Sequence, residues 1–90
     1  MSFEWDEDKN QTNIGKHGVS LSVASRIFEG PTLSWTDTRK DYGERRDISI
    51  GKLGGTVFLA VVHTSRNGNV RLISARPASR AERRLYEQAL

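Results

Sequence analysis

The segment that most constrains the fold is a run of six apolar residues, Val57-Phe58-Leu59-Ala60-Val61-Val62, with turn residues on both sides. Successive side chains of a β-strand point to opposite faces of the sheet, so this segment is apolar on both faces. Such a pattern is typical of a central strand. Gly54-Gly55 precedes the run and Arg66-Asn67-Gly68-Asn69 follows it, and both sequences are typical of hairpin turns.

The rest of the second half of the chain also has an apolar period of two, which predicts strands. We expect them at residues 33–37, 45–53, 56–64 and 69–76, after a very short strand at Phe3-Glu4-Trp5. In the second of these segments Ile48 and Ile50 share a face with Arg46, as in a sheet that is half covered by helices. Because the links are short and polar or rich in glycine, the strands are expected to form an antiparallel meander.

The first predicted helix has clear end signals but almost no apolar face. Asp6 is a candidate N-cap, the helix runs to His17, and Gly18 is a candidate C-terminal glycine. Ile14 is its only sizeable apolar residue. A helix without an apolar stripe gains little from burial, so we expect polar groups to dock on it.

Two further helices are predicted. The second follows Ser20 or Ser22 as a candidate N-cap and ends at Gly30-Pro31, with the apolar residues Val23, Ala24, Ile27 and Phe28 at helical spacing. The third opens with the capping box Ser79-Arg80-Ala81-Glu82 and runs to Leu90. The expected order is therefore β-α-α-β-β-β-β-α. This order predicts an α+β fold, an antiparallel meander sheet with helices packed on one face.

Length and composition limit the other possibilities. Ninety residues suit one domain, spanning 1–90, because a chain of this size cannot support two independent cores. Cysteine is absent, which excludes disulfides and thiolate chemistry, and the two histidines and scattered carboxylates offer no plausible metal ligand set. We therefore expect no metal and no cofactor. No segment is long and apolar enough to span a membrane, and residues 1–8 are acidic, unlike a secretory signal, so a cytoplasmic protein is expected.

Charge is distributed unevenly along the chain. The first ten residues carry four acids against Lys9, whereas residues 66–90 carry six arginines against two acids. Clustered arginine is typical of a protein that binds a polyanion such as RNA. An acidic protein partner fits the same pattern, and charge alone does not separate the two.

Four groups of residues occur in the order and at the spacing of a known family. They are Phe3-Glu4-Trp5-Asp6 with Lys9, Asn13 and Lys16-His17-Gly18-Val19; Gly43-Glu44 with Arg46 and Ile50-Gly51; Val61-Val62-His63-Thr64; and Arg71-Leu72-Ile73-Ser74-Ala75-Arg76 with Ala78, Glu82 and Tyr86. Together they resemble the signature of BrnT toxins over nearly the whole chain. The sequence departs from that pattern at Pro77, where such proteins often carry a basic residue, which leaves one phosphate contact in doubt.

The resemblance implies a RelE-like fold and an endoribonuclease that halts translation. It also implies neutralisation by a BrnA-type antitoxin that carries a DNA-binding segment, so that the toxin meets DNA only through the antitoxin complex. More than one antitoxin chain is paired with the toxin in such systems, which implies a hetero-oligomer.

RNA can be cut without a metal when the ribose 2′-hydroxyl attacks its own phosphodiester, which requires a base, an acid and positive charge near the phosphorane. Arg76, at the end of a strand, is the candidate stabiliser, and a surface ion pair is the alternative. His63 is a candidate base or else a packed, hydrogen-bonded histidine. Glu44 is a second candidate base, with Arg46 on the same strand face. The alternative is that Glu44 and Arg46 form only an ion pair.

Other basic and polar residues are candidate contacts. Lys16 and His17 either bind RNA or only complement a helix dipole. Lys9 and Asn13 share a helical face with Lys16, which is either a docking face for antitoxin or substrate or a solvated stripe. The candidate RNA contacts nearer the C-terminus are Arg71, Arg80, Arg84 and Tyr86. Core packing is the alternative for Tyr86, and a solvated or partner-binding face is the alternative for the arginines.

The residues alone are thus compatible with three functions. The family resemblance favours a metal-independent endoribonuclease. The same charge also suits a non-catalytic nucleic-acid-binding module, for which binding falls steeply with salt and no product forms. A pure protein-interaction module is the third alternative, indicated by the unusually polar first helix. In the ribonuclease hypothesis, positive side chains of the later strands and the last helix converge on one phosphate.

Overall fold

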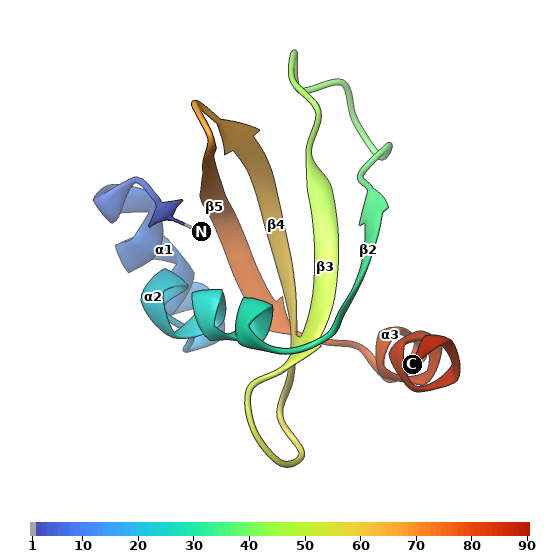
Figure 1. Cartoon of the computed structure of the whole chain (residues 1–90). Coiled ribbons are helices and arrows are strands. Elements are labelled where there is room, and N and C mark those ends of the chain that lie inside the picture. The colour runs from blue at the N-terminus through green and yellow to red at the C-terminus, as the bar shows by residue number, and fades with distance from the viewer. Residues whose placement is uncertain (1) are drawn as a thin grey trace.

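The predicted central strand, β4 (Phe58–Arg66), lies in the middle of a five-stranded sheet in the computed structural model, which describes residues 2–90 (Figure 1). The strand order is β1-β5-β4-β3-β2. The other strands are β1 (Phe3–Glu4), β2 (Thr32–Thr36), β3 (Asp47–Lys52) and β5 (Asn69–Pro77). The helices are α1 (Glu7–His17), α2 (Leu21–Ala24) and α3 (Arg80–Ala89), and a 3-10 helix, η1 (Ser25–Glu29), continues α2. Met1, in the acidic start, lies outside the described residues.

The sheet is mixed, so the expectation of a purely antiparallel meander is wrong. Strands β2 to β5 are antiparallel neighbours in chain order, but β1 pairs in parallel with β5, with Phe3 opposite Val70. The physical reason is the connection after β1. It is not a hairpin but a pair of helices, which returns the chain to the far edge of the sheet, at β2.

Helices pack on both faces of the sheet, so the expectation that they cover one face is also wrong. On one face Leu21, Ala24 and Ile27 pack on Leu59 and Val61. On the other face Tyr86 of α3 packs in a cluster with four sheet residues, Ile48, Ile50, Phe58 and Ala60. Figure 1 shows α2 and α3 on opposite sides of the sheet. A strand that is apolar on both faces needs cover on both, because each exposed large apolar side chain forfeits about 1.5–3 kcal/mol of burial.

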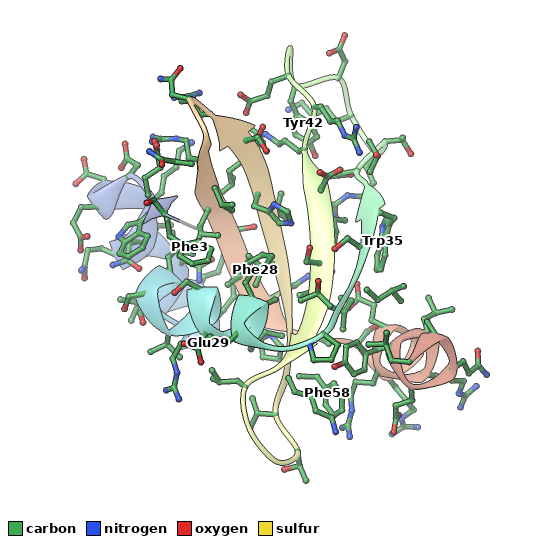
Figure 2. The ribbon with its side chains drawn as sticks, viewed as in Figure 1. Phe3, Phe28, Glu29, Trp35, Tyr42 and Phe58 are labelled. Atoms are coloured by element: carbon green, nitrogen blue, oxygen red, sulfur yellow. The ribbon has the colours of Figure 1, made fainter. Side chains whose placement is uncertain are left out.

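One glycine permits the close contact between η1 and the sheet. A Cβ on Gly51 would lie 2.8 Å from Cβ of Ile27, a distance that real side chains do not reach. Only glycine therefore allows Ile27 to pack directly on β3. Phe28, the next residue of η1, lies between η1 and the sheet (Figure 2).

The predicted helix caps are confirmed, although the second helix changes from α to 3-10 after Ala24. The side chain of Asp6 accepts a hydrogen bond from the Lys9 backbone, and Gly18 closes α1 in the left-handed region with φ 72°. Ser20, rather than Ser22, caps α2, and the Ser79–Glu82 capping box is complete. Each cap contributes about 1 kcal/mol to helix stability. None of the helices in residues 2–90 has the length and apolar character needed to cross a membrane.

Polar groups dock α1 on the rest of the molecule, as expected. Asn10 and Asn13 are its two buried residues. Oδ1 of Asn10 accepts a hydrogen bond from the backbone N–H of Leu21 at 2.8 Å. Asn13 bonds both the N–H and the C=O of Ala75 on β5. Because β1 pairs only with Val70 and Arg71, α1 occupies the β5 edge beyond them.

Candidate functional site

A basic cleft lies between α1, β5 and the β2–β3 connection. Its volume is about 300 Å³. The lining residues are Lys9, Thr12, Asn13, Lys16, His17, Arg39, Val62, Ile73, Ser74 and Arg76. We call this site the basic cleft, because its lining contains four permanent cations and a histidine but no carboxylate. Such a surface favours an anion.

The helix supplies one wall of the basic cleft. Lys9, Asn13 and Lys16 recur at helical spacing, so they share one side of α1. The buried Asn13 fixes that side against β5, with hydrogen bonds to Ala75. Lys9 and Lys16, one turn before and one turn after it, are exposed. The predicted alignment of these residues is thus correct. The amide of Asn13 is hydrogen-bonded inside the molecule, although Asn13 also lines the basic cleft, and its contact with an antitoxin stays a prediction.

A β-bulge shapes the opposite wall. Val62 pairs with Ser74 but His63 pairs with Leu72, which leaves Ile73 as an extra residue on β5. Bulges of this kind redirect side chains and are over-represented beside functional sites. Val62, Ile73 and Ser74 all line the basic cleft.

Arg76 enters the basic cleft from the end of β5. Its guanidinium forms a two-pronged ion pair with Glu82, at 2.7 and 2.9 Å, and its side chain stays 36% exposed. The hydrogen bonds from Arg76 lower the pKa of the Glu82 carboxyl to about 2, and those to Glu82 raise the pKa of Arg76. Glu82 is itself held by the capping box of α3. Arg76 can therefore both form this ion pair and stabilise a phosphate. The ion pair orients its guanidinium, which solvent still reaches.

Sequence reasoning missed Arg39. It lies in the β2–β3 connection, where its side chain makes two 2.9 Å hydrogen bonds to the buried carboxylate of Asp37. These hydrogen bonds hold the pKa of Asp37 well below its usual range. Arg39 and Arg76 both line the basic cleft, so two like charges lie around the same space. An anion between them relieves that repulsion. The one local sequence signal for a fixed Arg39 side chain is Asp37, two residues before it.

His63 lies on the face of the sheet away from Arg76. Arg76 pairs with Ala60, in the cluster that α3 covers, whereas the His63 ring packs edge-on against Phe28 at 5.1 Å on the α2 face. Nε2 of His63 lies 2.7 Å from the hydroxyl of the buried Ser49. Burial lowers the pKa of His63. This environment favours the packed, hydrogen-bonded interpretation of the residue.

Glu44 and Arg46 lie together, but not in the lining of the basic cleft. Glu44 accepts a hydrogen bond from Nε of Arg46 at 3.1 Å and forms a 3.5 Å ion pair with Arg66. Its pKa is lowered by the hydrogen bond from Arg46. The Arg46 guanidinium stacks 4.1 Å from the ring of Tyr42, which lies in the connection at one end of the sheet (Figure 2). Tyr42 hydrogen-bonds Asp37, so this group supports Arg39 indirectly.

The remaining predicted contacts do not converge on the basic cleft. Arg71 donates to Glu4 at 2.7 Å, beside β1. Arg80 and Arg84 line a separate hollow along α3. Tyr86 is only 6% exposed, and its hydroxyl donates to the Pro31 carbonyl, so its ring is not available to stack on a base. Arg80 and Arg84 thus do not line the basic cleft, and α3 contributes to it only through Glu82, which holds the guanidinium of Arg76.

Within residues 2–90 no group of three histidine, aspartate or glutamate side chains is arranged to hold a metal ion. The charged groups that do converge are those of the basic cleft, and they are cationic. Their repulsion disfavours a metal cation and favours a phosphate.

Comparisons with known proteins identify a family for this chain. Residues 5–82 match the family model described as the ribonuclease toxin BrnT of type II toxin-antitoxin systems. The crystal structure of the ribonuclease toxin BrnT from Brucella abortus is similar to this fold, with a TM-score of 0.66 and 30% sequence identity. The similarity covers 89% of this chain and 99% of the Brucella chain. A comparison with curated proteins gave no match. The matched residues include the whole lining of the basic cleft.

Proposed function

The chain belongs to the BrnT family of ribonuclease toxins of type II toxin-antitoxin systems, and from this premise we propose that the basic cleft is its RNA-cleavage site. The observation that carries the proposal is the convergence of Lys9, Lys16, His17, Arg39 and Arg76 on one hollow that contains no carboxylate. A single-stranded RNA backbone presents a phosphate at every nucleotide, and lysine and arginine bind it with a strong dependence on salt.

The proposed chemistry is attack by the ribose 2′-hydroxyl on the adjacent phosphorus. The 2′ oxygen forms a bond to phosphorus, its proton passes to the base, and the bond from phosphorus to the 5′ oxygen breaks. The leaving 5′ oxygen takes a proton from an acid. The products are a 2′,3′-cyclic phosphate and a 5′-hydroxyl, so that no water or electron is consumed.

Arg76 and Arg39 stabilise the charge of the phosphorane in this mechanism. A guanidinium offers parallel N–H donors to two phosphate oxygens. Glu82 and Asp37 hold the two guanidinium groups before RNA arrives. Such preorganisation is effective because the donors need no rearrangement during the reaction.

His17 is the proposed proton-transfer residue. It lies in the last turn of α1 and lines the same hollow as Arg76, whereas the alternatives His63 and Glu44 do not line it. A histidine can accept and donate a proton near neutral pH. Lys9 and Lys16, on the same helix, bind the neighbouring phosphates.

We also propose that the cleavage reaction needs no metal ion. The cationic lining supports a reaction without a metal, because it repels a divalent ion. We further propose cleavage of RNA in the cytoplasm, inhibition of translation, neutralisation by a BrnA-type antitoxin in a hetero-oligomer, and contact with DNA only through that complex. We also propose that the fold is RelE-like.

One experiment tests the cleavage proposal directly. The purified chain is incubated with a single-stranded RNA in excess EDTA, and the ends of the fragments are analysed chemically. We expect fragments that end in 2′,3′-cyclic phosphate. Loss of all cutting on chelation contradicts metal independence. Intact RNA at stoichiometric protein, with binding retained, supports a non-catalytic RNA-binding protein instead.

A further inference from the structure

An apolar groove of about 440 Å³ lies beside the basic cleft. It runs between the end of α1, α2 and the β3–β4 connection, and its apolar lining includes Ile14, Val19, Val23, Leu53, Val57 and Leu59. Ile14, Val23 and Val57 are 37%, 38% and 49% exposed, and they are three of the five large apolar residues exposed in residues 2–90. Gathered apolar exposure of this kind marks an interaction surface.

We propose that this groove docks an amphipathic, acidic segment of the antitoxin, and that the docked segment covers the edge of the basic cleft. Docking in the groove requires only that a type II toxin has an antitoxin. Coverage of the basic cleft rests on the proposed function of that cleft.

Charge around the groove indicates the chemistry of its partner. A second hollow shares Leu53 with the groove and is lined by two cations, Arg26 and Lys52, and one acid, Glu29. On the other side of the groove, α1 carries Lys16 and His17 in its last turn. Apolar side chains flanked by acids are therefore complementary to this surface. An amphipathic segment seated in a groove is a common mode of peptide recognition.

The groove and the basic cleft adjoin along two elements. On α1, Ile14 and Gly18 line the groove, whereas Asn13 and His17 line the basic cleft. At the end of β5, Pro77 lines the groove and Arg76 the basic cleft. Because consecutive strand residues point to opposite faces, the groove and the basic cleft lie on opposite faces of β5, and a segment reaches the basic cleft from the groove by passing over α1 at the β5 edge. Its acidic side chains then compete with RNA phosphate for the same cations.

The test measures binding of the antitoxin to groove variants by isothermal titration calorimetry. The probe is the product of the reading frame next to the toxin gene, chosen because it copurifies with the unmodified chain on coexpression. The variants are Val57→Glu, Val23→Glu and Val57→Lys. Leu85→Glu is the matched control, because Leu85 is 51% exposed and lies on α3, away from the groove.

We expect each glutamate variant in the groove to weaken binding about 30-fold or more, the effect of removing an interface hot spot. Val57→Lys is expected to weaken antitoxin binding less, because the lysine can pair with the acidic side chains of the antitoxin segment. Leu85→Glu is expected to bind within about twofold of the unmodified chain. Thermal unfolding of each variant verifies that it is folded, and two separate groove positions keep the test valid if one variant does not fold.

Wild-type affinity in both folded glutamate variants overturns the proposal, as does an equal loss in Leu85→Glu. A loss in Val57→Lys as large as in Val57→Glu overturns the acidic character of the partner. Displacement of a fluorescent RNA by antitoxin then tests the covering claim. Antitoxin should displace RNA from the unmodified chain, and a complex that keeps its RNA overturns coverage. Since calorimetry needs no RNA, failure of the cleavage proposal leaves the docking result intact and distinguishable.

Discussion

The side-chain amide of Asn13 makes the two hydrogen bonds to Ala75 that a neighbouring strand would make. Nδ2 donates to the Ala75 carbonyl at 2.9 Å, and Oδ1 accepts from the Ala75 N–H at 3.1 Å. Nδ2 also donates to the Val19 carbonyl. The β5 edge is thus closed by a helix side chain, because β1 ends too early to reach it. This contact holds α1 beside β5, and residues of both elements line the basic cleft.

Replacement of Asn13 is therefore expected to destabilise the whole fold. Asn13→Leu removes three hydrogen bonds and leaves the buried N–H of Ala75 without a partner, which costs about 2–3 kcal/mol. For a domain of this size we expect the melting temperature to fall by roughly 10 °C or more. Gln11→Ala, on the exposed side of the same helix, is the control, with little change expected. An Asn13→Leu variant as stable as the control contradicts the anchoring role.

Arg76 is expected to dominate RNA cleavage. Arg76→Ala should lower kcat by about 100- to 1000-fold, the usual effect of removing one charge-stabilising donor. Arg84→Ala is the matched control, because that arginine lies in the separate hollow on α3. Cleavage of a labelled RNA and arrest of growth are the two measurements, with thermal unfolding as the check on folding. Equal losses in the two variants would mean that the reaction does not occur in the basic cleft.

The two histidines are expected to behave differently. His17→Ala should lower kcat by about 100-fold or more if His17 transfers a proton. His63→Gln should retain cleavage within a few-fold but lower the free energy of unfolding by about 1 kcal/mol, because it disturbs the contacts with Ser49 and Phe28. Single-turnover cleavage and urea unfolding separate the two effects. If His63→Gln loses cleavage and His17→Ala does not, the base is His63.

Acid should weaken the pair that orients Arg76. The pKa of Glu82 is lowered from its ordinary 4.5 to about 2 in the folded chain, so its stabilising contribution is complete above pH 4.5 and is lost as the pH falls toward 2. After allowance for solvent screening we expect this contribution to be about 1–2 kcal/mol. Urea unfolding at pH 7 and pH 3 should show a larger deficit of Glu82→Gln relative to the unmodified chain at pH 7. A deficit independent of pH contradicts this.

Local patterns in the sequence determined most of the secondary structure. The apolar run around Leu59 specified the central strand, and Asp6, Gly18 and Ser79 specified helix ends, because each signal acts within a few residues of its own position. The motif order was also sufficient to indicate the family to which the chain belongs.

Only the tertiary structure decided which residues meet. Asn13 and Ala75, which are in contact, lie 62 positions apart in the sequence. Arg39 reaches the basic cleft from the irregular connection between β2 and β3. The face on which α3 packs depends on the path after Pro77, and the separation of His63 from Arg76 depends on the β4–β5 register. Shifting a strand by one position moves every side chain to the other face, and that register is fixed by packing between distant segments. The sequence therefore determined the elements and the charges, and packing decided which charges share one cleft.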